Sequence, residues 1–223
     1  MRRLDAAARA AGRPRPSLIA VSKTQPTAKV AELAALWSSQ GARPAFGENY
    51  VQEALAKQDE LAGLNGTVEW HLIGHLQSNK AREAATRFDW VQTVDRAKLV
   101  DALARHRPDA LPPLNVLLQV NIDDEASKHG CRPEELDALA DAVAAQPQLR
   151  LRGLMVIPFP HPQPEQRRDA FRRTAALFER LRRRFSDLDT LSMGMSDDFE
   201  IAIAEGATMV RVGTALFGAR ARR

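Results

Sequence analysis

Lys23 is the residue best suited to covalent chemistry, because it ends the apolar run SLIAVSK at residues 17–23. Side chains alternate along a strand, so Lys23 shares a face with Ile19 and Val21 and can point into the mouth of a β/α barrel. Desolvation lowers the pKa of an amine and keeps more of it neutral and nucleophilic, as a Schiff-base lysine requires. The alternative is a lysine whose ammonium group extends from the strand end into solvent.

Small residues near the end of the chain indicate a second site. Ser192, Gly194 and Ser196 share one face of a strand, and Gly213 with Thr214 directly follows the run MVRV at residues 209–212. Many β/α barrels bind a phosphate after their last two strands, through backbone N–H groups and the start of a helix. The sequence therefore predicts a phosphate site here. The alternative is a helix N-cap at residues 196–198 beside a tight turn.

Further candidate residues fall on interior faces by the same alternation. Arg211 is always cationic and needs an acceptor, which we expect to be either Glu69 or a ligand atom. His71 and His75 are four residues apart, as in some zinc sites, but they lie on a strand and its following turn rather than on one helix face. The sequence therefore predicts no metal site, and His71 is interpreted as a packed or ligand-contacting side chain. Asn49 and Met155 also fall on interior faces.

The elements that position these residues alternate regularly along the chain. Short apolar runs predict eight strands, and amphipathic stretches between them predict helices. Repeated β–α alternation is typical of parallel sheets, and eight strands can close a (β/α)8 TIM-type barrel. An open doubly wound sheet is the alternative, although the turn after the first strand, VSKTQP, lacks the glycines of a dinucleotide-binding turn. The expected strands are residues 17–23, 44–49, 68–74, 90–94, 114–121, 149–158, 190–195 and 209–218, and the expected helices are 27–40, 50–62, 78–87, 96–106, 133–146, 165–185 and 197–205.

The composition is that of an ordinary soluble globular chain. With 223 residues, 44% hydrophobic and 27% charged, it excludes disorder, collagen and a coiled coil as descriptions of the whole. We expect a single domain over residues 1–223, with residues 1–16 as a short helical extension. The single cysteine, Cys131, cannot close an intrachain disulfide, which favours the cytoplasm, and no apolar run is long enough to cross a membrane.

Arginines are concentrated at residues 167–184, RRDAFRRTAALFERLRRR. They alternate with apolar residues such as Phe171 and Phe178, which is the pattern of a solvated helix face. The formal net charge is only +4, which permits nucleic-acid binding without indicating it. We therefore expect no nucleic-acid partner.

Several motifs together carry a family resemblance from about residue 17 to residue 220. The chain resembles the pyridoxal phosphate homeostasis protein family. The resemblance implies one fold-type III barrel, similar to the N-terminal domain of alanine racemase, that binds pyridoxal 5′-phosphate (PLP) without established catalytic turnover. It also implies a protein that keeps PLP available to PLP-dependent apo-enzymes while limiting the free aldehyde. We expect it to be a cytoplasmic monomer. The motifs are AVSK (20–23), FGENYVQE (46–53), WHLIGHLQSNK (70–80), NVLLQVN (115–121), GLM (153–155), LSMGMSDD (191–198) and VRVGTALFG (210–218).

The resemblance also implies a role for each candidate residue. It makes Lys23 the Schiff-base lysine and places Arg211 at the pyridine nitrogen. Lys128, in the motif SKHG, would make a secondary contact with PLP. The phosphate would lie against Ser196, Gly213 and Thr214, and the wall around the ring would be formed by Asn49, His71 and Met155.

An amino-acid racemase or decarboxylase of the same fold is the alternative function. Such enzymes usually have a second β domain and a base donated across a dimer, whereas only residues 219–223 follow the last expected strand. The single tyrosine, Tyr50, is a poor candidate for the base because it follows the second strand. These features favour a PLP carrier over an enzyme.

Overall fold

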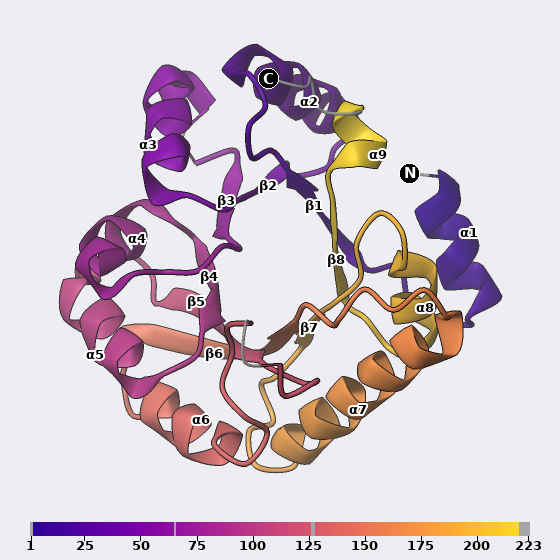
Figure 1. The fold of residues 1–223 in the computed structure, drawn as a ribbon. Coiled ribbons are helices and arrows are strands. Elements are labelled where there is room, and N and C mark those ends of the chain that lie inside the picture. Colours follow the sequence, from indigo (N-terminus) through magenta and orange to yellow (C-terminus); the bar gives the residue numbers. More distant parts are fainter. Residues whose placement is uncertain (1, 65, 126–127, 219–223) are drawn as a thin grey trace.

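Eight parallel strands close into a barrel in the order in which they occur along the chain (Figure 1). The computed structural model describes residues 2–64, 66–125 and 128–218. All eight expected strands are confirmed, and the parallel pairing of the first strand with the last closes the barrel, so the open-sheet alternative is wrong. The strands are β1 (Ser17–Val21), β2 (Ala45–Glu48), β3 (Glu69–Leu72), β4 (Trp90–Val94), β5 (Leu114–Val120), β6 (Leu149–Val156), β7 (Thr190–Ser192) and β8 (Met209–Val212).

Helices surround the barrel, as Figure 1 shows. Each of the seven expected helices is present, with ends that differ by a few residues. They are α2 (Thr27–Ser39), α3 (Val51–Glu60), α4 (Ala81–Arg87), α5 (Ala97–His106), α6 (Leu136–Ala144), α7 (Pro164–Arg182) and α8 (Phe199–Ala204). The remaining helical segments are α1 (Arg2–Ala10), α9 (Thr214–Phe217) and two short 3-10 turns, η1 (Ala62–Leu64) and η2 (Ser78–Lys80).

Two expected boundaries are wrong in an informative way. The last strand stops at Val212 rather than at Gly218, because the chain turns at Gly213 and begins the α9 turn. The helix expected from residue 133 begins at Leu136, where its buried apolar face starts. The residues before it form a turn in which the Glu135 carboxylate accepts a hydrogen bond from the Arg132 N–H at 2.8 Å.

Strand alternation divides the apolar residues between two cores. A small cluster fills the barrel interior and a larger one lies between the strands and the surrounding helices. Each fully buried Leu, Ile, Phe or Met side chain contributes about 1.5–3 kcal/mol. The interior of the barrel is therefore filled by side chains. A ligand can bind only at the mouth, where the strands end. The members of the interior cluster are Ile19, Trp90, Leu117, Met155 and Met209.

The first helix is attached to the barrel by α8. Leu4 and Ala8 of α1 are buried, and Arg3 lies 2.7 Å from Glu200 and stacks over the Phe199 ring. The Arg-rich helix α7 likewise buries an apolar stripe. Within the described ranges, no helix has the length and apolar content needed to cross a bilayer.

The arginines of α7, and Arg184 just after its end, pair with carboxylates. Arg168 lies 2.7 Å from Glu205, and Arg184 lies 2.7 Å from Asp141. Exposed pairs of this kind contribute about 0–1 kcal/mol each, so they balance charge more than they stabilise the fold. The basic residues of this helix are thus part of a mixed-charge surface, as the sequence pattern predicts.

Candidate functional site

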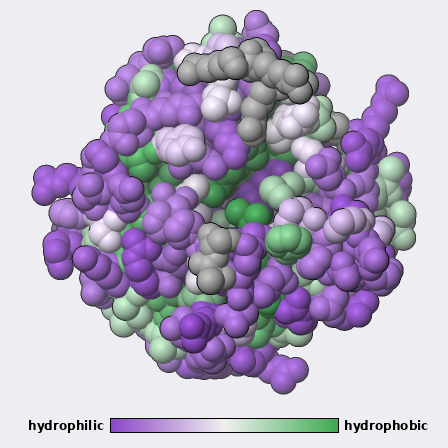
Figure 2. All heavy atoms as spheres, in the orientation of Figure 1, coloured by the Kyte–Doolittle hydropathy of each residue, from purple (hydrophilic) through white to green (hydrophobic). Residues whose placement is uncertain are grey.

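Five of the candidate residues line one cavity of about 200 Å3, at the ends of β1, β7 and β8. Lys23 comes from the turn after β1, Ser196 from the segment after β7, and Arg211 from β8 itself. Gly213 and Thr214 follow β8 and complete the set. The space-filling view down the barrel shows hydrophilic residues around a centre where hydrophobic residues are visible (Figure 2).

A buried ion cluster fixes the turn that carries Lys23. The Lys57 Nζ group of α3 donates to the Ser22 carbonyl oxygen at 2.6 Å and to Glu48 Oε1 at 2.7 Å. It also donates to Glu53 Oε1 at 2.8 Å, and this same oxygen accepts a hydrogen bond from the Thr24 N–H. The residues on both sides of Lys23 are therefore attached to α3.

Glu48 is the fully buried carboxylate of this cluster. Its Oε1 atom also accepts a hydrogen bond from the Ser22 hydroxyl at 2.6 Å. Burial raises the pKa of Glu48, although Lys57 and Ser22 act in the opposite direction. Removing one partner of such a buried pair costs about 3–5 kcal/mol, because the other charge stays buried without compensation.

Arg211 is buried beneath the cavity with its guanidinium fixed from two sides. Its Nη1 atom donates to Ser192 Oγ at 2.7 Å and its Nη2 atom donates to the Val156 carbonyl at 2.9 Å. Burial lowers the pKa of Arg211 to about 10, opposed by the charge of Asp198, so the side chain is still cationic at neutral pH. Glu69, the acceptor considered from the sequence, is not its direct partner.

Glu69 is instead the far end of a buried hydrogen-bond chain that starts at Arg211. Ser192 Oγ donates to Gln92 Oε1 at 2.7 Å, and Gln92 Nε2 lies 3.0 Å from His71 Nδ1. The other ring nitrogen, His71 Nε2, lies 2.8 Å from Glu69 Oε1. This chain, Arg211–Ser192–Gln92–His71–Glu69, is called the interior relay below.

The direction of every hydrogen bond in the interior relay follows from its ends. Arginine can only donate, so the Ser192 hydroxyl accepts from Arg211 and donates to the Gln92 carbonyl oxygen. Gln92 must then donate to His71 Nδ1, which leaves the His71 proton on Nε2, facing the Glu69 carboxylate. Burial would raise the pKa of Glu69, but His71, Arg43 and Arg152 together lower it, so this end is ionised at neutral pH.

The other four candidates lie outside the Lys23 cavity. His71 and Met155 are fully buried, His71 within the interior relay and Met155 in the interior cluster. Asn49 lines a neighbouring cavity at the ends of β2 and β3. Lys128 Nζ lies 3.5 Å from Glu125 and 5.2 Å from the Phe159 ring centre, and Ser127 of the same motif is outside the described residues.

Gly194 brings the end of β7 close to α8. Its φ angle is +92°, and a Cβ atom at this position would lie 2.6 Å from the Ala202 Cβ. The Gly194 carbonyl accepts a hydrogen bond from the Arg211 N–H at 3.0 Å, which ties this segment to β8. Asp198, at the N-cap of α8, accepts from the Met195 N–H at 2.7 Å. Ser196 is therefore held in a short turn between two fixed ends.

Sequence reasoning missed three buried residues that support the site through hydrogen bonds: Gln92, Glu48 and Lys57. Gln92 has a detectable signal, because alternation from the interior residue Trp90 also places it inside the barrel. Glu48 and Lys57 give a weaker one: a carboxylate in an apolar run, followed nine positions later by a lysine in the next helix. Neither pattern shows which partners closure of the barrel supplies.

Comparison with known proteins defines the family. The family model described as alanine racemase, N-terminal domain, matches residues 1–221. The pyridoxal phosphate homeostasis protein of Pseudomonas aeruginosa is 56% identical over 220 residues, which is 98% of this chain and 91% of that protein. Its counterpart from Escherichia coli K12 is 52% identical, over 92% of this chain and 86% of that protein.

The chain belongs to the pyridoxal phosphate homeostasis protein family. The resemblance carried by the motifs is therefore confirmed. Among solved structures, PipY of Synechococcus elongatus with PLP bound is 38% identical, with a TM-score of 0.82 over 97% of this chain and 99% of that chain. An alanine racemase of Clostridium difficile is 13% identical with a TM-score of 0.72, over 99% of this chain and 57% of the racemase. That likeness shows that this member of the pyridoxal phosphate homeostasis protein family shares the barrel fold of alanine racemase.

Proposed function

We propose that this chain binds PLP in the Lys23 cavity and takes part in PLP homeostasis by holding it as a Schiff base. The observation that carries the proposal is the convergence of an amine, a buried guanidinium and two hydroxyl side chains on one cavity. Support comes from the family membership and from the PLP-bound structure of PipY.

The residues of the cavity fit the functional groups of PLP. The Lys23 amine would attack the aldehyde carbon and release the aldehyde oxygen as water, forming the C=N bond of the Schiff base. The hydroxyls of Ser196 and Thr214 and the backbone N–H groups near Gly213 would bind the phosphate through charge-assisted hydrogen bonds. Arg211 uses two of its five N–H donors on Ser192 and Val156, and a further one would serve the pyridine nitrogen.

The same donor set favours holding PLP over turnover. Bound PLP supplies an electrophilic carbon and, when its ring nitrogen is protonated, an electron sink. Arg211 has no lone pair with which to accept a proton from that nitrogen, so it favours the unprotonated ring. Tyr50, the single tyrosine, lines the neighbouring cavity and is 63% exposed, so it does not supply a second base in the Lys23 cavity. We therefore propose a carrier that acts as a monomer in the cytoplasm and passes PLP to apo-enzymes.

Borohydride reduction tests the Lys23 assignment. Reduction of the PLP-loaded protein should fix the pyridoxyl group on the peptide that contains Lys23, and Lys23→Ala should abolish this product while the fold is unchanged. Lys29→Ala, an exposed lysine in the following helix, is the matched control and should be labelled as the wild type is. A pyridoxyl group found on another lysine of the wild-type protein would overturn the assignment.

Exchange of the substrate α-proton separates the carrier from the racemase alternative. The PLP-loaded protein is incubated with L-alanine in deuterated water, and we expect little or no deuterium at the α-carbon because Tyr50, the tyrosine considered as a second base, lines the neighbouring cavity rather than this one. Exchange at an enzyme-like rate that is lost in Lys23→Ala would favour a racemase-like enzyme instead.

A further inference from the structure

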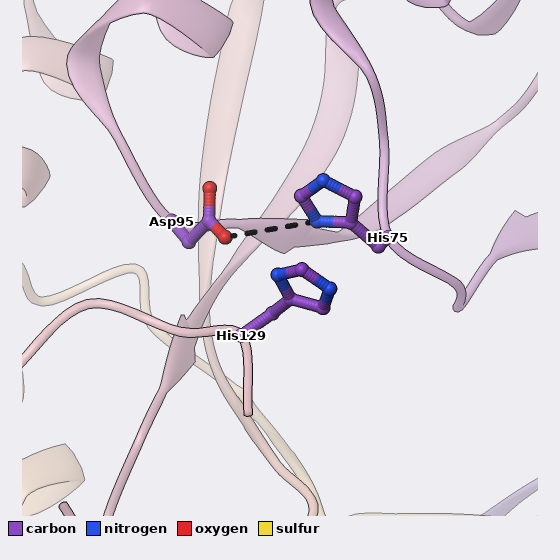
Figure 3. Close-up of side chains that lie close together, drawn as sticks. All are labelled: His75, Asp95 and His129. Atoms are coloured by element: carbon purple, nitrogen blue, oxygen red, sulfur yellow. Dashed lines mark ion pairs between the residues drawn. The ribbon is translucent and has the colours of Figure 1, made fainter. Parts of the chain in front are cut away.

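Three side chains from separate segments meet at the barrel mouth, outside the Lys23 cavity. His75 follows β3, Asp95 follows β4 and His129 lies after β5, and the side chains point toward one another (Figure 3). Their possible ligand atoms all lie within 4.8 Å of one another. The sequence spacing suggests His71 as the partner of His75, but His71 is committed to the interior relay. Closure of the barrel, rather than spacing, assembles this His75–Asp95–His129 cluster.

The carboxylate of Asp95 is oriented toward the histidines. Arg96 Nη1 donates to Asp95 Oδ1 at 2.5 Å, and the other oxygen, Oδ2, lies 4.0 Å from His75 Nδ1. Fixing one carboxylate oxygen by an outer hydrogen bond while the other faces the centre is the usual arrangement around a protein-bound metal. The Arg96 contact therefore orients Asp95 as a ligand.

The two imidazole rings are stacked, with centroids 3.6 Å apart and planes 14° from parallel. Both histidines are exposed, so small rotations of their side chains are sterically open. Metal–ligand bonds of about 2.0–2.2 Å place the ligand atoms of a tetrahedral site roughly 3.3 Å apart. The ligand atoms of the cluster, now within 4.8 Å of one another, can reach this separation by rotation of the side chains alone.

We propose that His75, Asp95 and His129 bind one divalent transition-metal ion, of which Zn2+ and Co2+ are the best fits. Two imidazoles and one carboxylate suit these ions, whereas Mg2+ and Ca2+ prefer oxygen ligands throughout. Arg96 also offsets the charge of Asp95, which disfavours ions held mainly by carboxylate charge.

Three protein ligands leave a tetrahedral ion one position for water or another small ligand. His75 also lines the cavity of about 400 Å3 that contains Asn49 and Lys80. The ion would therefore border a second cavity of the barrel mouth. This site is independent of PLP, because the cluster shares no residue with the lining of the Lys23 cavity.

Titration with Co2+ tests the site directly. The full chain freed of PLP should bind one Co2+ with the visible absorption of a tetrahedral ion, and equilibrium dialysis of the PLP-loaded chain should give one Zn2+ per chain. His75→Ala and His129→Ala should each weaken binding at least about tenfold, because even the loss of an outer partner of a metal ligand costs 10–100-fold. His106→Ala, at the end of α5, is the control and should bind as the wild type does.

Chemical modification gives a readout that does not depend on variants. Zn2+ should protect His75 and His129 of the wild-type protein from diethylpyrocarbonate while leaving His106 reactive. Unchanged metal affinity in both histidine variants, or equal modification of His75 and His129 with and without Zn2+, would overturn the proposal.

Discussion

Gln92 is the residue on which the interior relay depends, since its amide binds Ser192 on one side and His71 on the other. Gln92→Leu keeps an interior side chain but leaves the Ser192 hydroxyl and the His71 nitrogen without these partners. An unsatisfied buried polar group costs about 1–3 kcal/mol, so we expect a loss of this order in the free energy of unfolding, together with weaker PLP binding through a loosened Arg211. Urea unfolding and PLP titration measure the two effects.

The exposed residue Gln166 in α7 provides the matched control, because Gln166→Leu removes the same amide from a solvated helix face. We expect that variant to stay within about 0.5 kcal/mol of the wild type. Equal stability of the two variants would show that the interior relay contributes nothing to the fold.

Cys131 illustrates how burial controls reactivity at the scale of one side chain. It is 3% exposed, and burial raises the pKa of its thiol to about 12. Only the thiolate reacts with alkylating agents, and an unperturbed thiol has a pKa near 8.5. At pH 8 the native protein should therefore react with iodoacetamide about three orders of magnitude more slowly than the protein unfolded in urea.

The raised pKa of Cys131 also determines how its alkylation rate changes with pH. The native alkylation rate should keep rising about tenfold per pH unit well above pH 9, where the rate of the unfolded chain levels off. Because the chain has a single cysteine, the labelled site is unambiguous. Similar rates for native and unfolded protein at pH 8 would contradict the buried, protonated thiol.

At the scale of elements, Gly194 decides how closely the end of β7 approaches α8. A side chain there would adopt a left-handed backbone conformation and contact Ala202 and Phe199 at less than 3 Å. Such a conformation costs about 1–3 kcal/mol for a residue other than glycine, and overpacking adds a similar amount. We expect Gly194→Ala to lower the free energy of unfolding by at least this strain and to weaken PLP binding by displacing Ser196.

Gly63 in η1 is the control, since an added Cβ atom meets nothing within 4 Å. Gly63→Ala should change stability by no more than about 0.5 kcal/mol. If both alanine variants unfold at the same urea concentration, the close approach at Gly194 is not needed.

Strand alternation explains why so much of the barrel could be predicted from sequence. It assigned Lys23, Ser196 and Arg211 to interior positions, and the structure brings them to one cavity. It could not tell mouth from core, because depth along the barrel axis depends on the stagger between strands. His71 and Met155 share the interior face but lie below the mouth, in packed surroundings.

Contacts between distant loops were beyond sequence reasoning for a related reason. His75 and His129 are 54 residues apart, and they stack because β3, β4 and β5 are neighbours in the barrel. The pairing of Lys57 with Glu48 likewise depends on how α3 packs against β2. Sequence periodicity predicts the helices and strands and their order. The contacts between these side chains depend on how the strands and helices pack once the barrel has closed.

At the scale of the whole molecule, the proposed site would link ligand binding to stability, because PLP bound in the Lys23 cavity would bind only the folded barrel. Free PLP at about 100 times its dissociation constant would stabilise the folded state by about 2.7 kcal/mol. For a chain of this size that corresponds to a rise in Tm of roughly 5–11 °C.

Pyridoxal, which lacks the phosphate, separates the contribution of Ser196, Gly213 and Thr214 from that of Lys23. Each charge-assisted hydrogen bond to the phosphate contributes about 1.5–3 kcal/mol, so losing two of them weakens binding by more than about 100-fold. At the same concentration pyridoxal would occupy at most about half of the sites and raise Tm by less than about 2 °C. Thermal melts with matched concentrations of the two ligands measure this difference. Equal Tm shifts with the two ligands would show that the protein does not contact the phosphate, and the assigned phosphate site would be wrong. A smaller Tm shift with PLP that persists in Lys23→Ala would show that the phosphate contacts bind PLP without the covalent link.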